Sequence, residues 1–356
     1  MAYTTINKST DYFNTLLHTG NGSSPRSITG VGFQPDWVMT KNRSAANSNT
    51  VGDSVRGTGK TIFTDSTSAE LTNNSYGYHS AFASDGFSLT GSAASAGGDN
   101  VNKNSNDYVN WCWKANGAGS ANTDGSINST VSVNATSGFS IVKYVGNGGS
   151  SGTVGHGLNA VPKMIITKVT SASGDNWKVY HVSSGNTKVL QLNSTDAEAT
   201  SGAWYNTTPT SSVFSVGNDG ATNGSGKTII AYCFTEKTGY SKFGSYTGNG
   251  STDGSFIYTG FKPAFVIFKR SSGTGGWIIH DNKRSESNGG NSLRKYLVAQ
   301  TSGSEGTNDY FTIDTLSNGF KLKSTDGESN QSGQTYIYMA FGQSIVGSNN
   351  IPATAR

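Results

Sequence analysis

Short runs in which apolar and polar residues alternate are the dominant pattern along the chain. About six to eight such runs occur in each hundred residues, and Gly, Asn, Asp and Ser separate them. No stretch of about twelve residues shows an apolar period near 3.6, which is the period of an amphipathic helix. The pattern therefore predicts an all-β protein built from short strands.

Four landmarks recur three times in the same order, which indicates internal repetition. The first is a Gly-Asn-Gly turn, the second a proline followed by a strand-like run ending in Lys, the third a Phe-polar-aliphatic step, and the fourth an aromatic closing strand. The turn lies at 20–22, 146–148 and 248–250 in repeats 1, 2 and 3, and the proline run at 35–41, 162–168 and 263–269. The Phe-polar-aliphatic step lies at 87–89, 214–216 and 320–322, and the closing strand at 108–113, 229–234 and 336–341. The spacing predicts three homologous β-sandwich domains in tandem, each with its closing strand inside a sheet.

The predicted boundaries place repeat 1 at 1–115, repeat 2 at 139–238 and repeat 3 at 239–343, with a C-terminal tail at 344–356. Residues 116–138 consist largely of Gly, Ser, Asn, Ala and Thr, a composition typical of a flexible linker. Repeats 2 and 3 have only a short connection, so we expect them to pack together. Repeat 1 is expected to be separable, with proteases cutting first in the linker.

Composition and charge exclude several partners. The chain of 356 residues contains 47 glycines, only 13% charged residues and a formal net charge of +4 without a basic run, so we expect no nucleic-acid binding. No stretch approaches the ~20 apolar residues of a membrane span, and the first residues lack a signal-peptide pattern, so we expect no membrane insertion. Two cysteines cannot form a disulfide framework, in keeping with synthesis in a reducing cytoplasm.

Motifs that resemble catalytic or cofactor sites are better explained structurally. Residues 221–228 approximate a phosphate-binding loop, but a strand-like run follows them where such a loop needs a helix. Cys112 and Cys233 occupy the same repeat position as Ala340, which favours small buried side chains over a nucleophile. The five histidines are scattered, without metal-ligand spacing. We therefore expect no enzyme activity, no cofactor and no metal.

Trp111 and Trp113 share one face of the closing strand of repeat 1. Core packing is the favoured interpretation, and a platform for stacking sugars is the alternative.

Two Asp-x-x-Arg steps are the candidate site residues. Asp53 and Arg56 follow Lys41, and Asp281 and Arg284 follow Lys269 at the same spacing, so a structural ion pair in each repeat is predicted. A polar glycan pocket is the alternative. Repeat 2 reads Trp-Lys-Val-Tyr-His at 177–181 and lacks the step.

The N-terminal repeat resembles a domain of uncharacterised function that recurs in virion and tail-fibre-like proteins of marine tailed bacteriophages. The similarity rests on the start Met-Ala-Tyr-Thr-Thr-Ile, the Thr-Gly-Asn-Gly turn, and the segments 33–38, 41–43, 53–57, 85–87 and 111–115. It is closest over 11–117 and weaker over 139–236 and 242–343. The resemblance implies a structural role in the virion and brings no catalytic residues with it.

We accordingly expect a non-enzymatic virion protein on the particle exterior, either a capsid decoration or fibre or a short tail fibre, in contact with other virion proteins. Repeat 1 is expected to anchor it, with repeats 2 and 3 facing outward. A homo-oligomer, with a trimer favoured by analogy, would cover exposed strand edges. The alternative function is a module that binds or cleaves glycans at the host surface.

Overall fold

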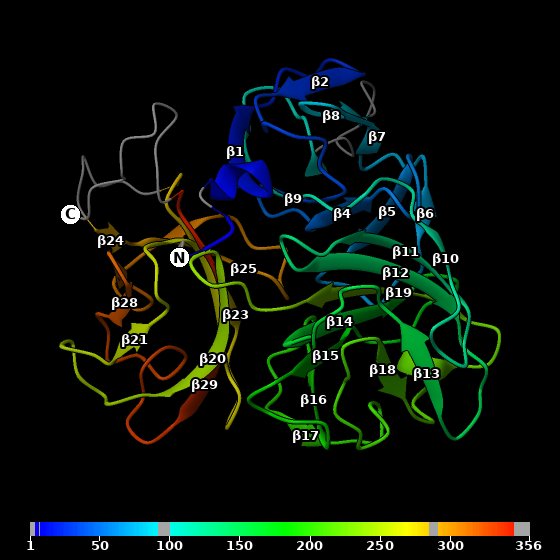
Figure 1. The fold of residues 1–356 in the computed structure, drawn as a ribbon. Coiled ribbons are helices and arrows are strands. Elements are labelled where there is room, and N and C mark those ends of the chain that lie inside the picture. The colour runs from blue at the N-terminus through cyan, green and yellow to red at the C-terminus, as the bar shows by residue number, and fades with distance from the viewer. Residues whose placement is uncertain (1–3, 7, 92–99, 285–290, 345–356) are drawn as a thin grey trace.

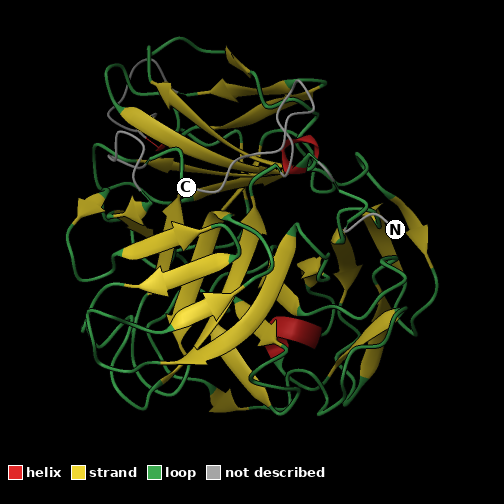
Figure 2. Cartoon of the chain, turned by 60° about the vertical axis from the view of Figure 1, so that its left-hand side comes forward, coloured by secondary structure: helices red, strands yellow, loops and turns green. Residues whose placement is uncertain are grey.

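The computed structural model describes residues 4–6, 8–91, 100–284 and 291–344, and these form an all-β protein. The predicted tail at 344–356 lies outside the described residues except for Ser344. In the described chain, the helical elements are a 3-10 turn η1 (Ser9–Asp11) and a four-residue helix α1 (Gly220–Asn223). Almost all other regular structure is strand, as Figure 2 shows. The prediction of an all-β fold is confirmed.

Repeat 1 is a sandwich of a larger and a smaller antiparallel sheet. The larger sheet contains, in spatial order, β1 (Phe13–Thr19), β9 (Asp107–Trp113), β3 (Trp37–Asn42), β4 (Thr50–Asp53), β5 (Lys60–Phe63) and β6 (Leu71–Thr72). The smaller sheet contains β2 (Arg26–Thr29), β8 (Gly86–Thr90) and β7 (Tyr78–Ala83).

Repeat 2 has the same plan with two strands added at one edge of the larger sheet. The order is β10 (Ser120–Asn122), β11 (Ser129–Asn134), β12 (Phe139–Val145), β19 (Thr228–Phe234), β14 (Met164–Val169), β15 (Lys178–His181), β16 (Lys188–Gln191) and β17 (Ala199–Thr200). The smaller sheet pairs β13 (Gly152–Gly155) with β18 (Val213–Val216).

Repeat 3 matches repeat 1 strand for strand in its larger sheet. The order is β20 (Ser241–Thr247), β29 (Thr335–Gly342), β22 (Pro263–Arg270), β23 (Trp277–Asp281), β25 (Lys295–Val298) and β26 (Gly306–Thr307). The smaller sheet contains β21 (Phe256–Tyr258), β28 (Gly319–Leu322), β27 (Ile313–Leu316) and β24 (Ser292–Leu293).

The predicted closing strands lie inside their sheets, as the sequence pattern indicated. β9 lies between β1 and β3, β19 between β12 and β14, and β29 between β20 and β22. The Phe-polar-aliphatic steps belong to β8, β18 and β28, and their phenylalanines Phe87, Phe214 and Phe320 are buried in the core of each sandwich.

A fourth hydrophobic core lies at the centre of the molecule, where the three larger sheets meet. Each larger sheet is therefore buried on both faces, which explains why every residue of β3 and of β14 is buried. Trp113, Phe234 and Phe341 occupy the same register position in their repeats, and Trp113 lies 6.4 Å from Phe234 and 5.7 Å from Phe341 between ring centroids. Trp111 and Trp113 belong to this central core, so core packing is confirmed for them.

The segment 116–138 is not a flexible linker, and that prediction is wrong. Ser120–Asn122 and Ser129–Asn134 form β10 and β11, and β11 pairs with β12 along its whole length. The carboxylate of buried Asp36 accepts hydrogen bonds from the backbone nitrogens of Ala115 (2.7 Å) and Gly117 (3.0 Å), which holds the start of the segment against repeat 1. The Gly- and Ser-rich composition reflects turns and close backbone approaches rather than disorder.

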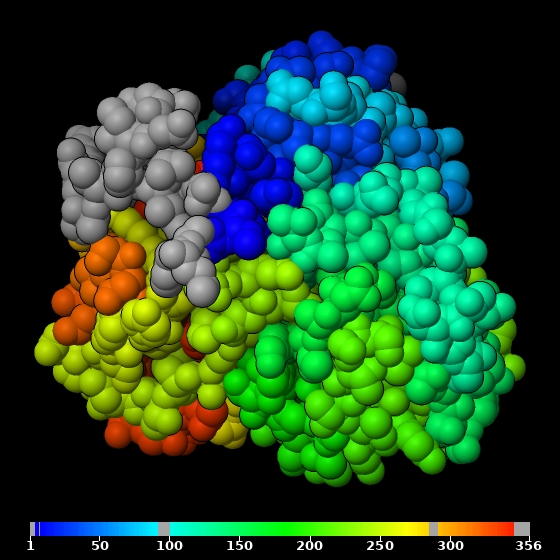
Figure 3. Space-filling view, viewed as in Figure 1, coloured from blue at the N-terminus to red at the C-terminus, as the bar shows by residue number. Residues whose placement is uncertain are grey.

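Repeat 1 is not set apart from the other two. We call the interfaces seam 1–2, seam 2–3 and seam 3–1, after the repeats that meet there. The blue N-terminal residues lie against the yellow third repeat in Figure 3, and Ser9 Oγ donates to the carbonyl of Gln343 at 3.1 Å. The expectation of a separable repeat 1 is therefore replaced by a closed ring of three sandwiches.

Candidate functional site

Both Asp-x-x-Arg steps form buried ion pairs at the end of the fourth strand of a larger sheet. Arg56 Nε donates to Asp53 Oδ2 at 2.5 Å, and Arg284 Nε donates to Asp281 Oδ2 at 2.6 Å. The other oxygen of each aspartate accepts the backbone N–H of its own arginine, so each pair closes a tight turn. Burial acts to lower the pKa of Arg56, but the neighbouring Asp53 carboxylate raises it above the ordinary value.

These carboxylates also reach across the seams. Tyr232 of repeat 2 donates its hydroxyl to Asp53 Oδ2 at 2.7 Å, and Trp111 of repeat 1 donates Nε1 to Asp281 Oδ2 at 3.0 Å. Tyr232 and Trp111 occupy the same register position in β19 and β9. The predicted site residues are thus a repeated contact between neighbouring repeats.

The departure of repeat 2 follows from the same geometry. Met339 is the residue of repeat 3 at the register position of Tyr232 and Trp111, and a thioether has no proton to donate. His181 replaces the aspartate and contributes the donor itself, because its Nε2 lies 3.1 Å from the carbonyl oxygen of Tyr338 across seam 2–3. Burial lowers the pKa of His181 to about 4, so the ring is neutral at pH 7.

A lysine crosses each seam as well. These lysines lie at the end of the strand face that points toward the central core. They are Lys41 in β3, Lys168 in β14 and Lys269 in β22, and all three are 0% exposed. Their Nζ atoms donate to carbonyl oxygens of a neighbouring repeat, namely Ser302 (2.7 Å), Thr67 (3.1 Å) and Thr195 (2.9 Å) respectively. Burial lowers the pKa of each lysine to about 8. The three contacts run in one direction around the ring, as a threefold arrangement requires.

Each seam has one further contact, made by the residue that lies opposite the lysine on the adjacent strand. Trp177 Nε1 donates to the Phe63 carbonyl at 3.0 Å, and Trp277 Nε1 donates to the Gln191 carbonyl at 2.8 Å. Asn49 takes this place in repeat 1 and donates to the Ala299 carbonyl at 2.7 Å. The sequence showed the repeated lysines, but nothing in it indicated that their partners lie in another repeat.

The remaining motifs have structural roles. Cys112 and Cys233 are buried and unpaired, and burial raises the pKa of both thiols. The phosphate-loop-like segment 221–228 contains the end of α1 and runs directly into β19, and its Lys227 pairs with Asp175 at 2.7 Å. Within the described ranges, no group of three or more His, Cys, Asp or Glu is arranged to hold a metal ion.

One surface breaks the equivalence of the repeats and is a candidate binding face. The aromatic face, as we call it, is the outer side of β21, where Phe256 is 47% and Tyr258 61% exposed. The corresponding residues are Ser27 and Thr29 in repeat 1 and Thr153 and Gly155 in repeat 2. Only repeat 3 therefore places two large aromatic rings in solvent here.

Polar side chains continue the aromatic face across the sheet. Lys321, Asp314 and Ser292 follow Phe256 in register on β28, β27 and β24. Lys321 pairs with Asp253, and Ser292 donates to Asp314. A flat aromatic surface next to charged and hydroxyl groups suits a ligand with both an apolar and a polar face.

The chain belongs to a family defined by a domain of unknown function, DUF7483, whose profile matches residues 8–344. The match spans all three repeats, so the family's unit is the whole ring rather than one sandwich. Neither the comparison with curated proteins nor that with solved structures yields a match. Among the described residues, no helix has the length and apolarity needed to cross a membrane.

Proposed function

We propose that the protein is a non-enzymatic structural component on the exterior of a bacteriophage particle. It is synthesised in the host cytoplasm, and in the particle it is bound to other virion proteins. The form is a capsid decoration or fibre, or a short tail fibre. One observation carries the structural part of the proposal. Apart from Asp36, which holds the segment between repeats 1 and 2, the buried charged residues of the described chain all serve the seams.

A structural role accounts for this use of charge. Buried ionic groups are costly unless they are paired, and catalytic groups must meet a substrate. Here Lys41, Asp53 and their counterparts are enclosed between repeats, where they hold the ring together. The phage assignment itself rests on the resemblance of repeat 1 to virion proteins.

Mass spectrometry of purified particles of the encoding phage tests the proposal. We expect peptides of this chain in mature particles at a stoichiometry of several copies or more, and loss of the protein after mild surface proteolysis. Absence from mature particles would overturn the virion role.

Self-association is a further part of the proposal. β2 and β21 lie at the edges of the smaller sheets, and such edges are often covered by oligomerisation. We expect a homo-oligomer, with a trimer favoured, in light-scattering measurements. A stable monomer at micromolar concentration would contradict it.

A second candidate function is recognition of a host-surface glycan by the aromatic face. The favouring observation is the pair of exposed rings that only repeat 3 carries. Replacing Phe256→Ser and Tyr258→Thr, the residues of repeat 1, should abolish binding to host envelope polysaccharide. Tyr76→Thr removes another half-exposed tyrosine and is the control. Equal binding by both variants, or no binding by the native protein, would remove this function.

A further inference from the structure

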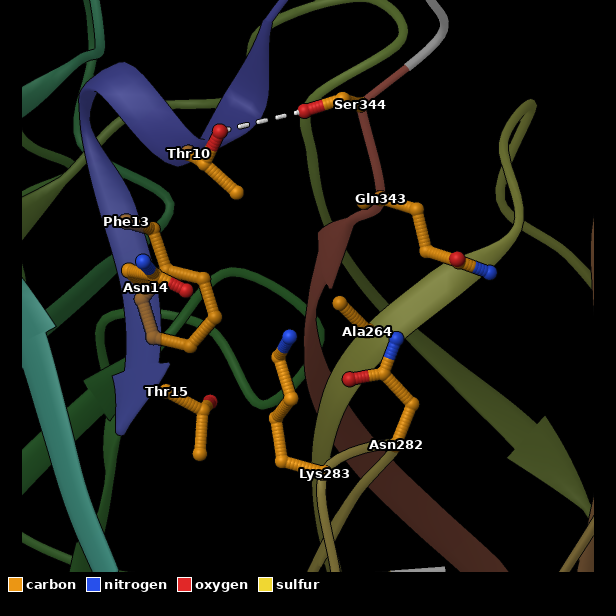
Figure 4. A pocket seen from close by; sticks show the side chains of 10 residues that line it. Thr10, Phe13, Asn14, Thr15, Ala264, Asn282, Lys283, Gln343 and Ser344 are labelled. Carbon is orange, nitrogen blue, oxygen red and sulfur yellow. Dashed lines mark hydrogen bonds between the residues drawn. The ribbon is translucent and has the colours of Figure 1, made fainter. Parts of the chain in front are cut away.

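We propose that a pocket at seam 3–1 binds a small molecule through one carboxylate group. The pocket has a volume of about 210 Å³ and lies between β1 of repeat 1 and β22 of repeat 3. Figure 4 shows Lys283 projecting between Phe13 and Ala264 into this space. Nothing in the proposed virion role requires such a pocket, and the inference stands apart from it.

The pocket exists because this seam is closed differently from seam 1–2. There, Asp36 occupies the position of Ala264, and its carboxylate binds the segment that joins the two repeats. At this end of seam 3–1, Thr10 and Ser344 instead approach each other, and their hydroxyl oxygens lie 3.4 Å apart. Among the described residues, the short side chain of Ala264 and the absence of a segment like 116–138 across this seam leave the space open.

At two positions that face the space, seam 3–1 has a polar residue where seam 1–2 has an apolar one. Thr15 corresponds to Ile141 in repeat 2 and to Phe243 in repeat 3, both of which belong to the central core. Lys283 lies two residues after Asp281, a position that in repeat 1 is held by Val55 of the same core. Two positions that are apolar at seam 1–2 are thus polar at seam 3–1, and seam 2–3 has one polar residue there, Ser183.

Thr15 supplies an independent indication of a ligand. It is only 4% exposed, and its hydroxyl has no hydrogen-bond partner among the described residues. A buried hydroxyl without a partner costs about 1–3 kcal/mol, so such groups normally meet a ligand or an ordered water. Fourteen described side-chain atoms lack a partner in this way, and Thr15 is the one of these residues that lines the pocket.

The lining selects the class of ligand. Lys283 is the one charged residue among the described residues that line the pocket, and side-chain amides come from Asn14, Asn282 and Gln343. A single ammonium group neutralises a monoanion, and amide N–H groups donate to its oxygens. The volume is below the ~300–1,000 Å³ of pockets for drug-sized ligands, so the molecule is small. These features point to a monocarboxylate, either a simple acid or a sugar acid.

Titration calorimetry with the full chain tests the assignment, using acetate and glucuronate as probes and glucose as the neutral control. We expect at least one of the two acids to bind at about millimolar or lower concentration, and glucose not to bind. Tighter binding of acetate indicates a simple acid, and tighter binding of glucuronate indicates a sugar acid. Binding of glucose as tight as that of the better acid, or no binding of either acid, would overturn the proposal.

Variants locate the site. Lys283→Gln should weaken binding at least tenfold, whereas Lys163→Gln, which removes a lysine from the position of Ala264 at seam 2–3, should leave it unchanged. Thr15→Ile places the residue of repeat 2 at this position and removes the hydroxyl from the pocket lining, so it should weaken binding without lowering the melting temperature. Equal affinities for the native protein and Lys283→Gln would place the acid elsewhere and contradict the proposal.

Discussion

At the scale of single residues, each aspartate and lysine at a seam satisfies groups of two repeats at once. Asp53 accepts from Arg56 of its own repeat and from Tyr232 of the next. Removing one partner of a buried charged contact leaves the other unpaired, which is more costly than losing an exposed contact. Seam residues should therefore be much more sensitive than surface residues of the same type.

Tyr232→Phe tests this sensitivity directly, because it deletes only the hydroxyl that donates to Asp53. We expect a loss of about 1.5–3 kcal/mol in the free energy of unfolding, as for hydrogen bonds to charged groups. Tyr310→Phe is the matched control, since Tyr310 is 63% exposed and should change stability by less than about 0.5 kcal/mol. Equal urea midpoints for the two variants would mean that the seam contact contributes little.

Asp53→Asn should be more damaging than Tyr232→Phe, because it leaves the buried Arg56 guanidinium without its nearest counter-charge. Breaking a buried ion pair costs about 3–5 kcal/mol. Urea unfolding of the two variants side by side checks the order. A milder effect for Asp53→Asn would show that Glu70, which lies 3.1 Å from Arg56, is sufficient alone.

Acid should destabilise the protein through its buried histidines. The pKa of His181 is lowered by burial from 6.5 to about 4, so the unfolded chain takes up the proton first as the pH falls. The contribution of His181 to stability is therefore complete above about pH 6.5 and is lost progressively toward pH 4. His79 and His280, with pKa values lowered by burial to about 3 and about 4, act in the same direction.

His181→Gln separates this titration from packing, because glutamine keeps an N–H donor but does not titrate in this range. We expect the slope of stability against pH between 6.5 and 4 to fall by up to about 1.4 kcal/mol per pH unit. Measurement of urea midpoints at several pH values, with pH 8 as the reference for packing effects, gives the slope. An unchanged slope would mean that His181 is not the group that titrates.

The sequence indicated the residues of the seams without their partners. The Asp-x-x-Arg spacing was visible because both residues belong to one turn, and the repeated lysines were visible because they end similar strands. Tyr232, Trp111 and His181 could not be assigned to these contacts, because each lies in a different repeat from its partner. Only the packing of three repeats brings them together.

At the scale of strands, the segment between repeats 1 and 2 shows how a glycine-rich composition can specify order. Gly119 has φ of +80°, and a Cβ at this position would lie 2.7 Å from the backbone of Val131 in β11. The glycine thus allows β10 and β11 to approach as a hairpin. The composition of the segment predicted a coil, because composition indicates flexibility but does not show where two backbone segments lie close together.

Gly119→Ala should disrupt that hairpin, whereas Gly117→Ala is a control with the same kind of backbone strain. Gly117 has φ of +65° but no atom within 4 Å of an added Cβ. We expect a cost of about 1–2 kcal/mol for Gly117→Ala from the left-handed conformation alone, and a distinctly larger cost for Gly119→Ala. Urea unfolding measures both. Equal costs would show that the hairpin tolerates the added methyl group.

Strand identity was largely predictable, and the arrangement of strands was not. The interior position of the closing strands follows from their apolar character on both faces, which the sequence displays directly. The second apolar face of each larger sheet contacts other repeats rather than its own smaller sheet. Hydrophobic pattern alone does not state which partner covers a face, so the ring was not foreseen.

At the scale of the whole molecule, the three seams use equivalent positions and run in one direction around the ring. Backbone contacts follow the same order, since the nitrogens of Glu70, Glu198 and Glu305 donate to the carbonyls of Thr170, Ser271 and Arg43. The face of each larger sheet that points toward the central core is buried only by the other two repeats. The three sandwiches are therefore expected to unfold as one cooperative unit.

Hydrogen exchange followed by mass spectrometry at increasing urea tests this cooperativity most directly, because each peptide reports the opening of its own segment. We predict that peptides from 13–113, 116–138, 139–234 and 241–342 lose their slowest-exchanging protection at one common urea concentration. The contradicting result is loss of protection in 116–138 and release of 13–113 at a lower urea concentration than the rest, which would restore a separable first repeat.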